Sequence, residues 1–225
     1  MRILAVADKE CDALWDNYSP GKLREYDLIL SCGDLKAEYL RFLVTMARCP
    51  LLYVHGNHDG RYAADPPEGC DCIEDSLVVY RGLRILGLGG SRGHVNGSHQ
   101  YTERQMRKRV RKLRRALTLA GGADIVVAHA APLGVGDADD MTHKGFEVFL
   151  SLIDEHKPKY FLHGHVHLNY GFNIARVNEY GGTQVTNCWE KQVFDCPVHT
   201  GPLPFQALPR FIVKALAPNL VIIDQ

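Results

Sequence analysis

Short apolar runs, each closed by a polar or glycine residue, recur along the 225 residues of this chain. Continuous apolar stretches bounded by such residues are typical of strands that are buried on both faces. Five runs therefore predict buried strands, at residues 3–7, 28–30, 51–54, 125–127 and 160–162. The first three alternate with other segments, including a helical pattern at 37–48, and this alternation indicates βαβ units in a parallel sheet.

The middle of the chain predicts a mixture of hairpins and helices. Gly82 separates two strand-like runs, 77–81 and 83–88, in a predicted hairpin. The strongest helical pattern covers 102–119, because Thr102 suits a helix start and apolar residues follow at spacings of three and four. Beyond it we expect a strand at 125–128, a helix at 146–156, a strand at 159–163 and a hairpin of 172–177 with 183–187.

A short polar cluster follows each of the five buried runs. The clusters are Asp8, Gly33-Asp34, Gly56-Asn57-His58-Asp59, His129 and Gly164-His165-Val166-His167. Because function in parallel α/β sheets gathers at the carboxyl ends of the strands, these side chains are expected to meet. Two divalent ions roughly 3.5–4 Å apart, held by such groups, can clamp a phosphoryl group between its attacking and leaving oxygens. The pattern predicts a two-metal phosphoesterase site.

In order and spacing, these clusters resemble the calcineurin-like metallophosphoesterase family, whose pattern is Asp-x-His, Gly-Asp, Gly-Asn-His-Asp, a single His and Gly-His-x-His. The resemblance runs from residue 3 to about residue 187. It implies an α/β fold, a four-layer α/β/β/α sandwich of two packed mixed β-sheets flanked by helices. One position departs from the pattern, because Asp8-Lys9-Glu10 stands where the family usually has His two residues after the first Asp.

The resemblance also implies a role for each site residue. The implied metal ligands are Asp34 as the bridge between two ions, Asp8 and His167 at the first ion, and Asn57, His129 and His165 at the second. His58 is implied to be the general acid and oxyanion stabiliser, with Asp59 holding its ring. Residues two apart on an extended segment point the same way, so His165 and His167 could each reach one ion. The mixed ligand set suits Mn, Fe or Zn better than a pure Mg site.

Glu10 is the open position in this ligand set. A carboxylate can replace imidazole at a metal, and residues 8 and 10 of an extended segment project to the same side, so Glu10 is slightly favoured as a ligand of the first ion. The alternatives are a weakly held first ion, or Lys9 reaching the substrate phosphate. For His129 the alternative is a buried structural histidine at a strand end.

Other histidines lie outside the family pattern, among them His55, His94, His99, His143, His156 and His163. The loops that carry His94, His99 and His143 could overhang the site, although solvated loops are the simpler interpretation. Residues 104–115 hold eight basic residues that could face a phosphate backbone. We favour a solvated helix face, because no aromatic residues are interleaved with them.

Composition limits the remaining possibilities. With 46% hydrophobic residues, the chain can bury one sizeable core, and we expect a metallophosphoesterase domain at 1–190. Residues 191–225 are predicted to be an extension packed on the same domain or on a second subunit; their apolar runs, 211–216 and 220–223, suit a terminal hairpin or an arm. The 26 basic and 26 acidic residues give no global field that would mark a nucleic-acid or membrane binder.

Seven cysteines in apolar and loop positions suit free thiols in a reducing compartment. Cys70 and Cys72 are the only close pair, and the sequence shows no further zinc ligands at finger-like spacing. The amino-terminal apolar run is too short for a signal-peptide core, and no stretch approaches a membrane span. The expected location is the cytoplasm.

The sequence thus predicts a metal-dependent phosphohydrolase that cleaves a small phosphate ester by a metal-activated water at two divalent ions. A phosphodiesterase or nuclease and a non-catalytic scaffold are the alternatives, the latter because a retromer subunit resembles this family. No nucleic-acid or membrane partner is expected, and a homo-oligomer remains open. The fold alone does not name the substrate.

Overall fold

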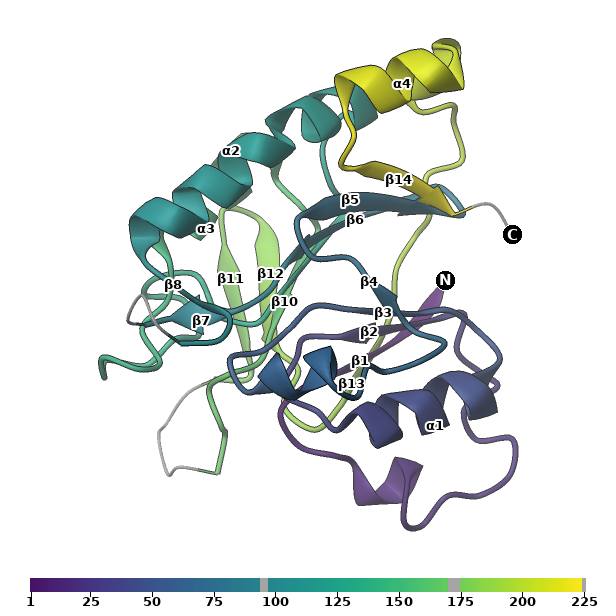
Figure 1. Ribbon diagram of the computed structural model, residues 1–225, viewed down its shortest axis with the longest axis vertical. Coiled ribbons are helices and arrows are strands. Elements are labelled where there is room, and N and C mark those ends of the chain that lie inside the picture. Colours follow the sequence, from purple (N-terminus) through teal and green to yellow (C-terminus); the bar gives the residue numbers. More distant parts are fainter. Residues whose placement is uncertain (94–96, 170–174, 224–225) are drawn as a thin grey trace.

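Two mixed β-sheets form the centre of the protein, as a computed structural model of the chain shows (Figure 1). The structure describes residues 1–93, 97–169 and 175–223. The first sheet has the strand order β13-β1-β2-β3-β4, and the second has the order β11-β12-β10-β9-β6-β5-β14. Strands β7 and β8 make a small separate pair.

The first sheet is built mainly from the amino-terminal third of the chain. Its strands are β1 (Arg2–Val6), β2 (Leu28–Ser31), β3 (Leu51–Tyr53), β4 (Asp71–Cys72) and β13 (Gln192–Asp195). The first four are parallel, and β13 pairs antiparallel with β1. Helix α1 (Ala37–Ala47) and the 3₁₀ turns η1 (Asp12–Leu14) and η2 (Asp59–Ala63) belong to the same part of the chain.

The second sheet is larger and carries the remaining helices. Its strands are β5 (Ser76–Tyr80), β6 (Leu83–Leu88), β9 (Ile125–Ala128), β10 (Tyr160–His163), β11 (Val177–Tyr180), β12 (Thr183–Asn187) and β14 (Leu220–Ile223). The short strands β7 (Ser91–Arg92) and β8 (Gln100–Tyr101) follow β6. The helices are α2 (Glu103–Ala120), α3 (Glu147–His156) and α4 (Arg210–Leu216), with a 3₁₀ turn η3 (Pro204–Ala207) before α4.

Three apolar layers hold the sheets and helices together. Alternate residues of each strand point to opposite faces, so Ile3 and Ala5 pack toward the second sheet while Leu4 and Val6 pack toward α1. On the other side, Leu86 and Val126 of the second sheet pack against α2 and α3. Figure 1 shows α1 on one outer side and α2 with α3 on the other. The predicted four-layer α/β/β/α sandwich is therefore confirmed.

Most predicted elements are present with shifts of one or two residues at their ends. The predicted hairpin at Gly82 is β5 and β6, which pair antiparallel. The hairpin near residue 180 is β11 and β12, so its first strand begins at Val177, whereas the predicted strand 172–177 lies partly among residues outside the described ranges. No helix in the described ranges is both long and apolar enough to cross a membrane.

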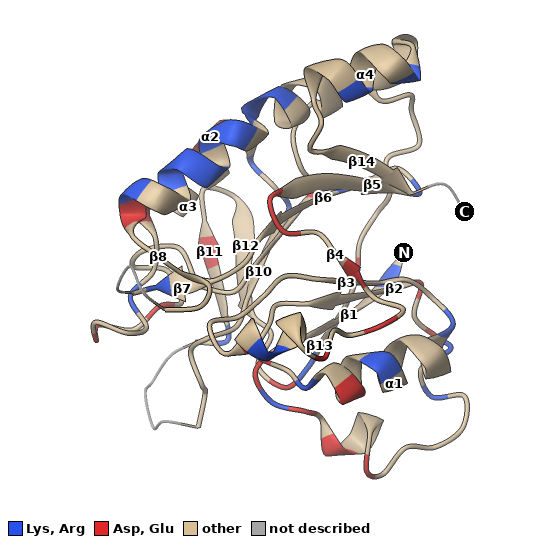
Figure 2. Ribbon diagram, in the orientation of Figure 1, with Lys and Arg blue, Asp and Glu red and all other residues tan. Residues whose placement is uncertain are grey.

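Helix α2 begins where the sequence predicts and ends at a left-handed glycine. Thr102 caps it, accepting a hydrogen bond from the Gln105 backbone N–H at 3.3 Å, and Gly121 has φ +73° at its end. Its exposed face carries four basic residues at helical spacing, here called the basic stripe: Arg104, Lys108, Arg111 and Arg115. Figure 2 shows this basic surface along the outside of the helix. The predicted solvated face thus consists of exposed residues, although Arg109 of the same run is buried.

The segment after residue 190 contributes one edge strand to each sheet. Strand β13 pairs with β1, and β14 pairs in parallel with β5. Between them, Phe205 and Val213 are buried in the apolar layer that also holds α2. Because residues 210–216 are helical, the alternative of a terminal hairpin is wrong.

Candidate metal centre

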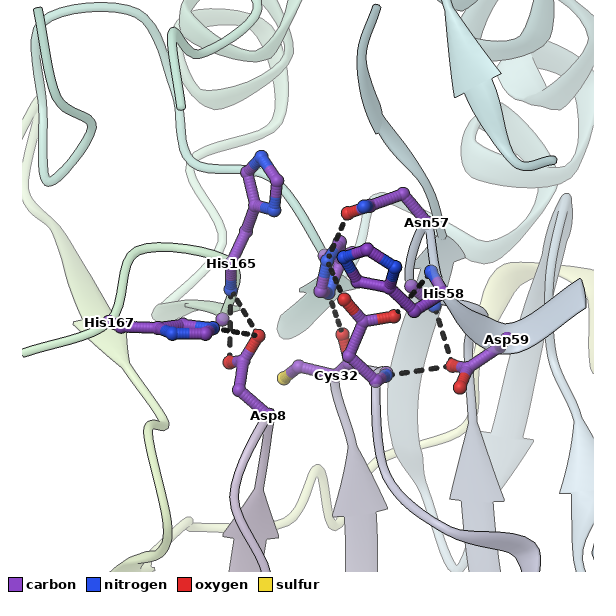
Figure 3. Close-up of polar contacts among 12 residues, drawn as sticks. Asp8, Cys32, Asn57, His58, Asp59, His165 and His167 are labelled. Carbon is purple, nitrogen blue, oxygen red and sulfur yellow. Dashed lines mark hydrogen bonds and ion pairs between the residues drawn. The ribbon is translucent and has the colours of Figure 1, made fainter. Parts of the chain in front are cut away.

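The predicted ligands come from the carboxyl ends of strands in both sheets. Asp8 follows β1, Asp34 follows β2, Asn57 follows β3, and His129 directly follows β9. His165 and His167 follow β10. Figure 3 shows Asp8 and His167 on one side of the resulting group, with Asn57, His58 and Asp59 on the other. The packing of the two sheets brings these segments together.

Three of these residues have a left-handed backbone. Asp8, Asp34 and His165 have φ values of 62°, 60° and 66°. A positive φ is uncommon for residues other than glycine, and such residues cluster at functional sites. The left-handed backbone also ends the alternation of the strand, so spacing along an extended segment no longer decides where the next side chains point.

Two glycines allow the loops to approach each other closely. A Cβ atom at Gly56 would collide with the Asp34 carboxylate, and one at Gly164 would collide with the Asp8 carboxylate. The glycines that precede Asn57 and His165 therefore make room for the acidic groups of the site.

His129 has its ring fixed between the two sheets. It is fully buried, and its Nδ1–H donates to the Cys32 carbonyl at 2.8 Å. Its Nε2 then faces two acceptors, Asp34 Oδ2 at 3.2 Å and Asn57 Oδ1 at 3.1 Å. A cation or a proton between His129 Nε2, the Asp34 carboxylate oxygen and the Asn57 amide oxygen would satisfy all three atoms.

The pKa values of His129 and Asp34 also favour a positive charge between these two side chains. Burial lowers the pKa of His129, but the carboxylates of Asp34 and Asp8 outweigh it and raise this pKa to about 9. Burial raises the pKa of Asp34, but His129 and the His58 backbone N–H outweigh it and hold this pKa well below its usual range. A proton on His129 occupies the place that suits a metal ion, so a metal would compete with it.

His165 is a neutral, nearly buried imidazole on the opposite loop. Burial and the nearby charge of His129 lower its pKa to about 3. Its Nε2–H donates to the Thr142 carbonyl at 2.8 Å, which leaves Nδ1 as the lone-pair nitrogen. The His129 and His165 ring centres are 4.9 Å apart. Fixing one nitrogen by a hydrogen bond is how proteins orient a metal-binding histidine.

Asp8 and His167 form the other side of the group. The fully buried Asp8 carboxylate accepts from the His165 backbone N–H at 2.9 and 3.0 Å, and its Oδ1 lies 3.7 Å from His167 Nε2. The His167 ring packs against Trp189, with ring centres 4.1 Å apart. Asn187 steadies this loop through its side-chain N–H, which donates to the Val166 carbonyl at 2.7 Å.

The residues present fit divalent metal ions. Within the described part of the chain, Asp34, His129 and His165 each offer a ligand atom within 4.8 Å of the other two, and Asn57 adds an amide oxygen beside them. Asp8 and His167 supply a second carboxylate and a third imidazole next to this group. The set of oxygen and imidazole ligands suits ions such as Mn, Fe or Zn.

His58 and Asp59 differ in burial and in the groups that they contact. His58 is exposed, and its backbone N–H donates to Asp34 Oδ1 at 2.8 Å. Asp59 was expected to hold the His58 ring, but its fully buried Oδ2 accepts two backbone N–H groups instead, from Asp34 at 2.7 Å and Gly56 at 2.8 Å. The structure therefore places Asp59 as a clamp between the loops after β2 and β3.

Glu10 and Lys9 both have partners outside the ligand group. Glu10 Oε1 accepts from the Lys36 backbone N–H at 3.1 Å, at the start of α1. Lys9 Nζ lies 3.6 Å from Glu190 Oε1. Because Asp8 has φ 62°, the extended spacing that favoured Glu10 as a ligand does not hold here. A carboxylate at a helix amino terminus is favourable in its own right.

A cavity of about 540 Å³ opens beside these ligands. It is lined by Asn57, His58 and His165, by Arg92 of β7 and Gln100 of β8, and by the loop of Thr142, His143 and Lys144. The loop of His143 thus borders the site, contrary to the simpler interpretation of a solvated loop. His94 lies outside the described residues, and the sequence offered no signal for Arg92 or Lys144.

The fold and the converging ligands resemble those of metal-dependent phosphoesterases. The chain belongs to the calcineurin-like phosphoesterase superfamily, whose domain model matches residues 1–188. This match confirms the family resemblance of the sequence motifs.

Individual relatives are distant. UPF0046 protein T07D4.2 of Caenorhabditis elegans is 25% identical over 162 residues, which cover 65% of this chain and 38% of that protein. The chain therefore matches well under half of that relative's length. TT1561 of Thermus thermophilus has a similar fold, with a TM-score of 0.60 and 19% identity over 84% of this chain and 89% of that chain. GAP50, the anchor in the inner membrane complex of Plasmodium, has a TM-score of 0.49 and 13% identity over 84% of this chain and 71% of that chain.

Proposed function

We propose that the protein is a phosphohydrolase that uses two divalent metal ions to cleave a small phosphate ester. The observation that carries this proposal is the convergence of six ligand residues from two sheets beside a cavity that His58 lines. The ligands are Asp8, Asp34, Asn57, His129, His165 and His167. Mn, Fe or Zn suit these groups best.

The chain's own residues orient two ligand rings, fix the loops that carry other ligands and expose His58 in the cavity. The Cys32 carbonyl and the Thr142 carbonyl orient the His129 and His165 rings. Asp59 fixes the loops that carry Asp34 and Asn57 through their backbone. Divalent ions held by these residues would supply Lewis-acid activation of water and stabilisation of developing negative charge. His58 is exposed in the cavity, and in this proposal it would give a proton to the leaving oxygen.

The cavity favours an anionic substrate of modest size. Its volume of about 540 Å³ lies within the range of small-molecule sites. Arg92 and Lys144 line it and bring positive charge beside the ligand group. Arg92 is held in place by its guanidinium, which donates to the Gly145 carbonyl at 3.1 Å. These groups would bind the phosphate or a second anionic group of the substrate.

The rival functions have less support. A nuclease would need a basic surface that continues into the site, but none of the cavity-lining residues comes from α2, where the basic stripe lies. A scaffold without catalysis would not need an exposed histidine in the cavity beside a full ligand group. His58 and the retained ligands therefore favour the enzyme.

Substitution of His58 tests the proposal. His58→Ala should lower turnover of an ester with a poor leaving group by roughly 10²–10⁴-fold while metal content stays unchanged. Exposed His199, which lies outside the cavity, provides the matched control, and His199→Ala should keep full turnover. If the wild-type protein hydrolyses no mono- or diester in a broad panel under saturating Mn²⁺, the enzymatic proposal is refuted.

A further inference from the structure

A second group of metal-binding side chains lies outside the ligand set described above. His55 Nδ1 is 2.5 Å from Glu74 Oε2 and 3.9 Å from Cys72 Sγ. The His99 ring stacks on the His55 ring, with ring centres 4.2 Å apart and planes 5° from parallel. Imidazole, carboxylate and thiol groups thus meet at one place.

Three chain segments bring these residues together. The pairing of β3 with β4 sets Tyr53 opposite Cys72, so that His55, two residues beyond Tyr53, reaches the segment of Cys72 and Glu74. The third segment, before β8, carries His99. Backbone hydrogen bonds hold it there, because Gly90 N–H donates to the His55 carbonyl at 2.7 Å and Ser91 N–H donates to the His99 carbonyl at 3.0 Å.

The ligand atoms lie close enough to share one ion once the stacked His55 and His99 rings turn toward it, because an imidazole lone pair lies in the plane of its ring. His55, Glu74 and His99 each offer a ligand atom within 4.8 Å of the other two. Ligands of one zinc ion, at bond lengths of about 2.0–2.3 Å, lie roughly 3–4.5 Å from each other. The short contact between His55 and Glu74 would open slightly on metal binding. Cys72 lies outside this group of three, but it is exposed, and its Sγ, 3.9 Å from His55 Nδ1, would supply the soft ligand that zinc prefers.

Arg109 prepares the carboxylate for this role. Its side chain, only 8% exposed, donates to Glu74 Oε1 at 2.7 Å and to Asp75 Oδ1 at 2.7 Å, and it packs over the Tyr101 ring. Oε1 is thereby occupied, and Oε2 is left to face His55. Hydrogen-bonded carboxylates of this kind are usual around metal sites.

The summed charge of these side chains would balance that of a divalent ion. Glu74 and Asp75 carry two negative charges, and Arg109 neutralises one of them. A thiolate at Cys72 would bring the sum to minus two, and a divalent cation would neutralise it. Metal binding would release the thiol proton of Cys72 and any proton held between His55 and Glu74.

We propose that His55, Cys72, Glu74 and His99 form a separate site for a zinc-like ion, distinct from the site proposed for phosphate-ester hydrolysis. Such an ion would tie together the loop that leads to Asn57 and His58, the segment after β4 and the segment before β8. It would stabilise one wall of the cavity. The site stands on its own geometry and does not depend on the hydrolytic proposal.

Cobalt provides a specific test, because a cysteine thiolate bound to Co²⁺ gives a charge-transfer absorption band in the near ultraviolet. None of the six ligands of the hydrolytic site is a cysteine. Titration of the metal-free protein should therefore produce this band, with one thiolate-bound Co²⁺ per chain, and Zn²⁺ should remove it. The same titration of Asp34→Asn should still give the band.

The close cysteine pair supplies the matched control. Cys72→Ser should abolish the band, whereas Cys70→Ser, two residues away, should retain it. His99→Ala should weaken Co²⁺ affinity at this site by roughly tenfold or more, as loss of a metal-site residue does. Circular dichroism checks that each variant is folded. The proposal is overturned if the folded wild-type protein shows no thiolate band at saturating Co²⁺, or if the band persists in Cys72→Ser.

Discussion

Asp59 offers a sharp test of how the site is built, because two roles for it predict different results. As a clamp, it matters through one oxygen, Oδ2, which accepts the backbone N–H groups of Asp34 and Gly56 at 2.7 and 2.8 Å. As a partner of the His58 ring, it would matter through its charge. Asp59→Ala removes the acceptor, whereas Asp59→Asn keeps an oxygen there, removes the charge and replaces Oδ1, 3.5 Å from the Arg61 guanidinium, by an amide NH₂.

The expected change in the free energy of unfolding of each variant follows from these contacts. A hydrogen bond to a charged group contributes about 1.5–3 kcal/mol, so Asp59→Ala should lower the free energy of unfolding by roughly 3–4 kcal/mol once some water enters. Burial and the charge of Asp34 raise the pKa of Asp59, which shows that the surroundings disfavour its charge. Asp59→Asn should therefore change the free energy of unfolding by only about 1 kcal/mol or less.

Urea unfolding of the metal-free proteins measures this difference, with the midpoint shifting and the denaturant slope unchanged. Turnover and metal content of the reconstituted proteins complete the comparison. We expect Asp59→Asn to keep both. Equal destabilisation of the Asn and Ala variants would contradict the clamp. A large loss of turnover in Asp59→Asn, with stability and metal content intact, would show that Asp59 acts on His58.

Three further predictions concern other parts of the molecule. Glu10→Ala should keep the full metal content and lower the free energy of unfolding in urea by about 1 kcal/mol or less, since Glu10 accepts a hydrogen bond from the Lys36 backbone N–H. Loss of one ion in this variant would show that Glu10 is a ligand. His163 is buried, its Nε2 has no hydrogen-bond partner among the described residues, and burial lowers its pKa to about 4. As the pH falls, the unfolded state therefore takes up the proton first, and the free energy of unfolding should fall by up to about 3 kcal/mol between pH 6.5 and pH 4. In EDTA-treated His163→Asn this part of the pH dependence should vanish. An unchanged pH profile in that variant would contradict the prediction. Reversing the four charges of the basic stripe should leave turnover within about twofold of the wild-type value. DNA or RNA binding by the wild-type protein should be negligible at physiological salt. Salt-sensitive binding that the charge reversal abolishes would favour the nuclease.

Local patterns were enough to predict the ligand segments and most of the strands and helices before residue 190. The apolar runs and their closing residues lie next to one another in the sequence, so Asp34 after β2 and His129 after β9 could be placed at strand ends. The helix start at Thr102 was equally local, because its side chain and Gln105 are three residues apart.

The direction of single side chains was harder to predict. The extended spacing that favoured Glu10 fails because Asp8 adopts a left-handed backbone, which closes the loop against the other sheet. The contact of His55 with Cys72 depends on the register of β3 and β4, which a sequence pattern does not give. Arg109 was counted with the basic surface, but its fixed partners Glu74 and Asp75 come from a distant segment.

Electron paramagnetic resonance of the Mn²⁺-reconstituted protein tests the central claim most directly, because two manganese ions that share a bridging ligand give an exchange-coupled spectrum. We predict this spectrum at about two bound Mn²⁺ ions per chain, as two-metal catalysis requires, and its loss in Asp34→Asn. A spectrum of isolated Mn²⁺ ions at saturation, or one unchanged in Asp34→Asn, would contradict a metal pair bridged by Asp34.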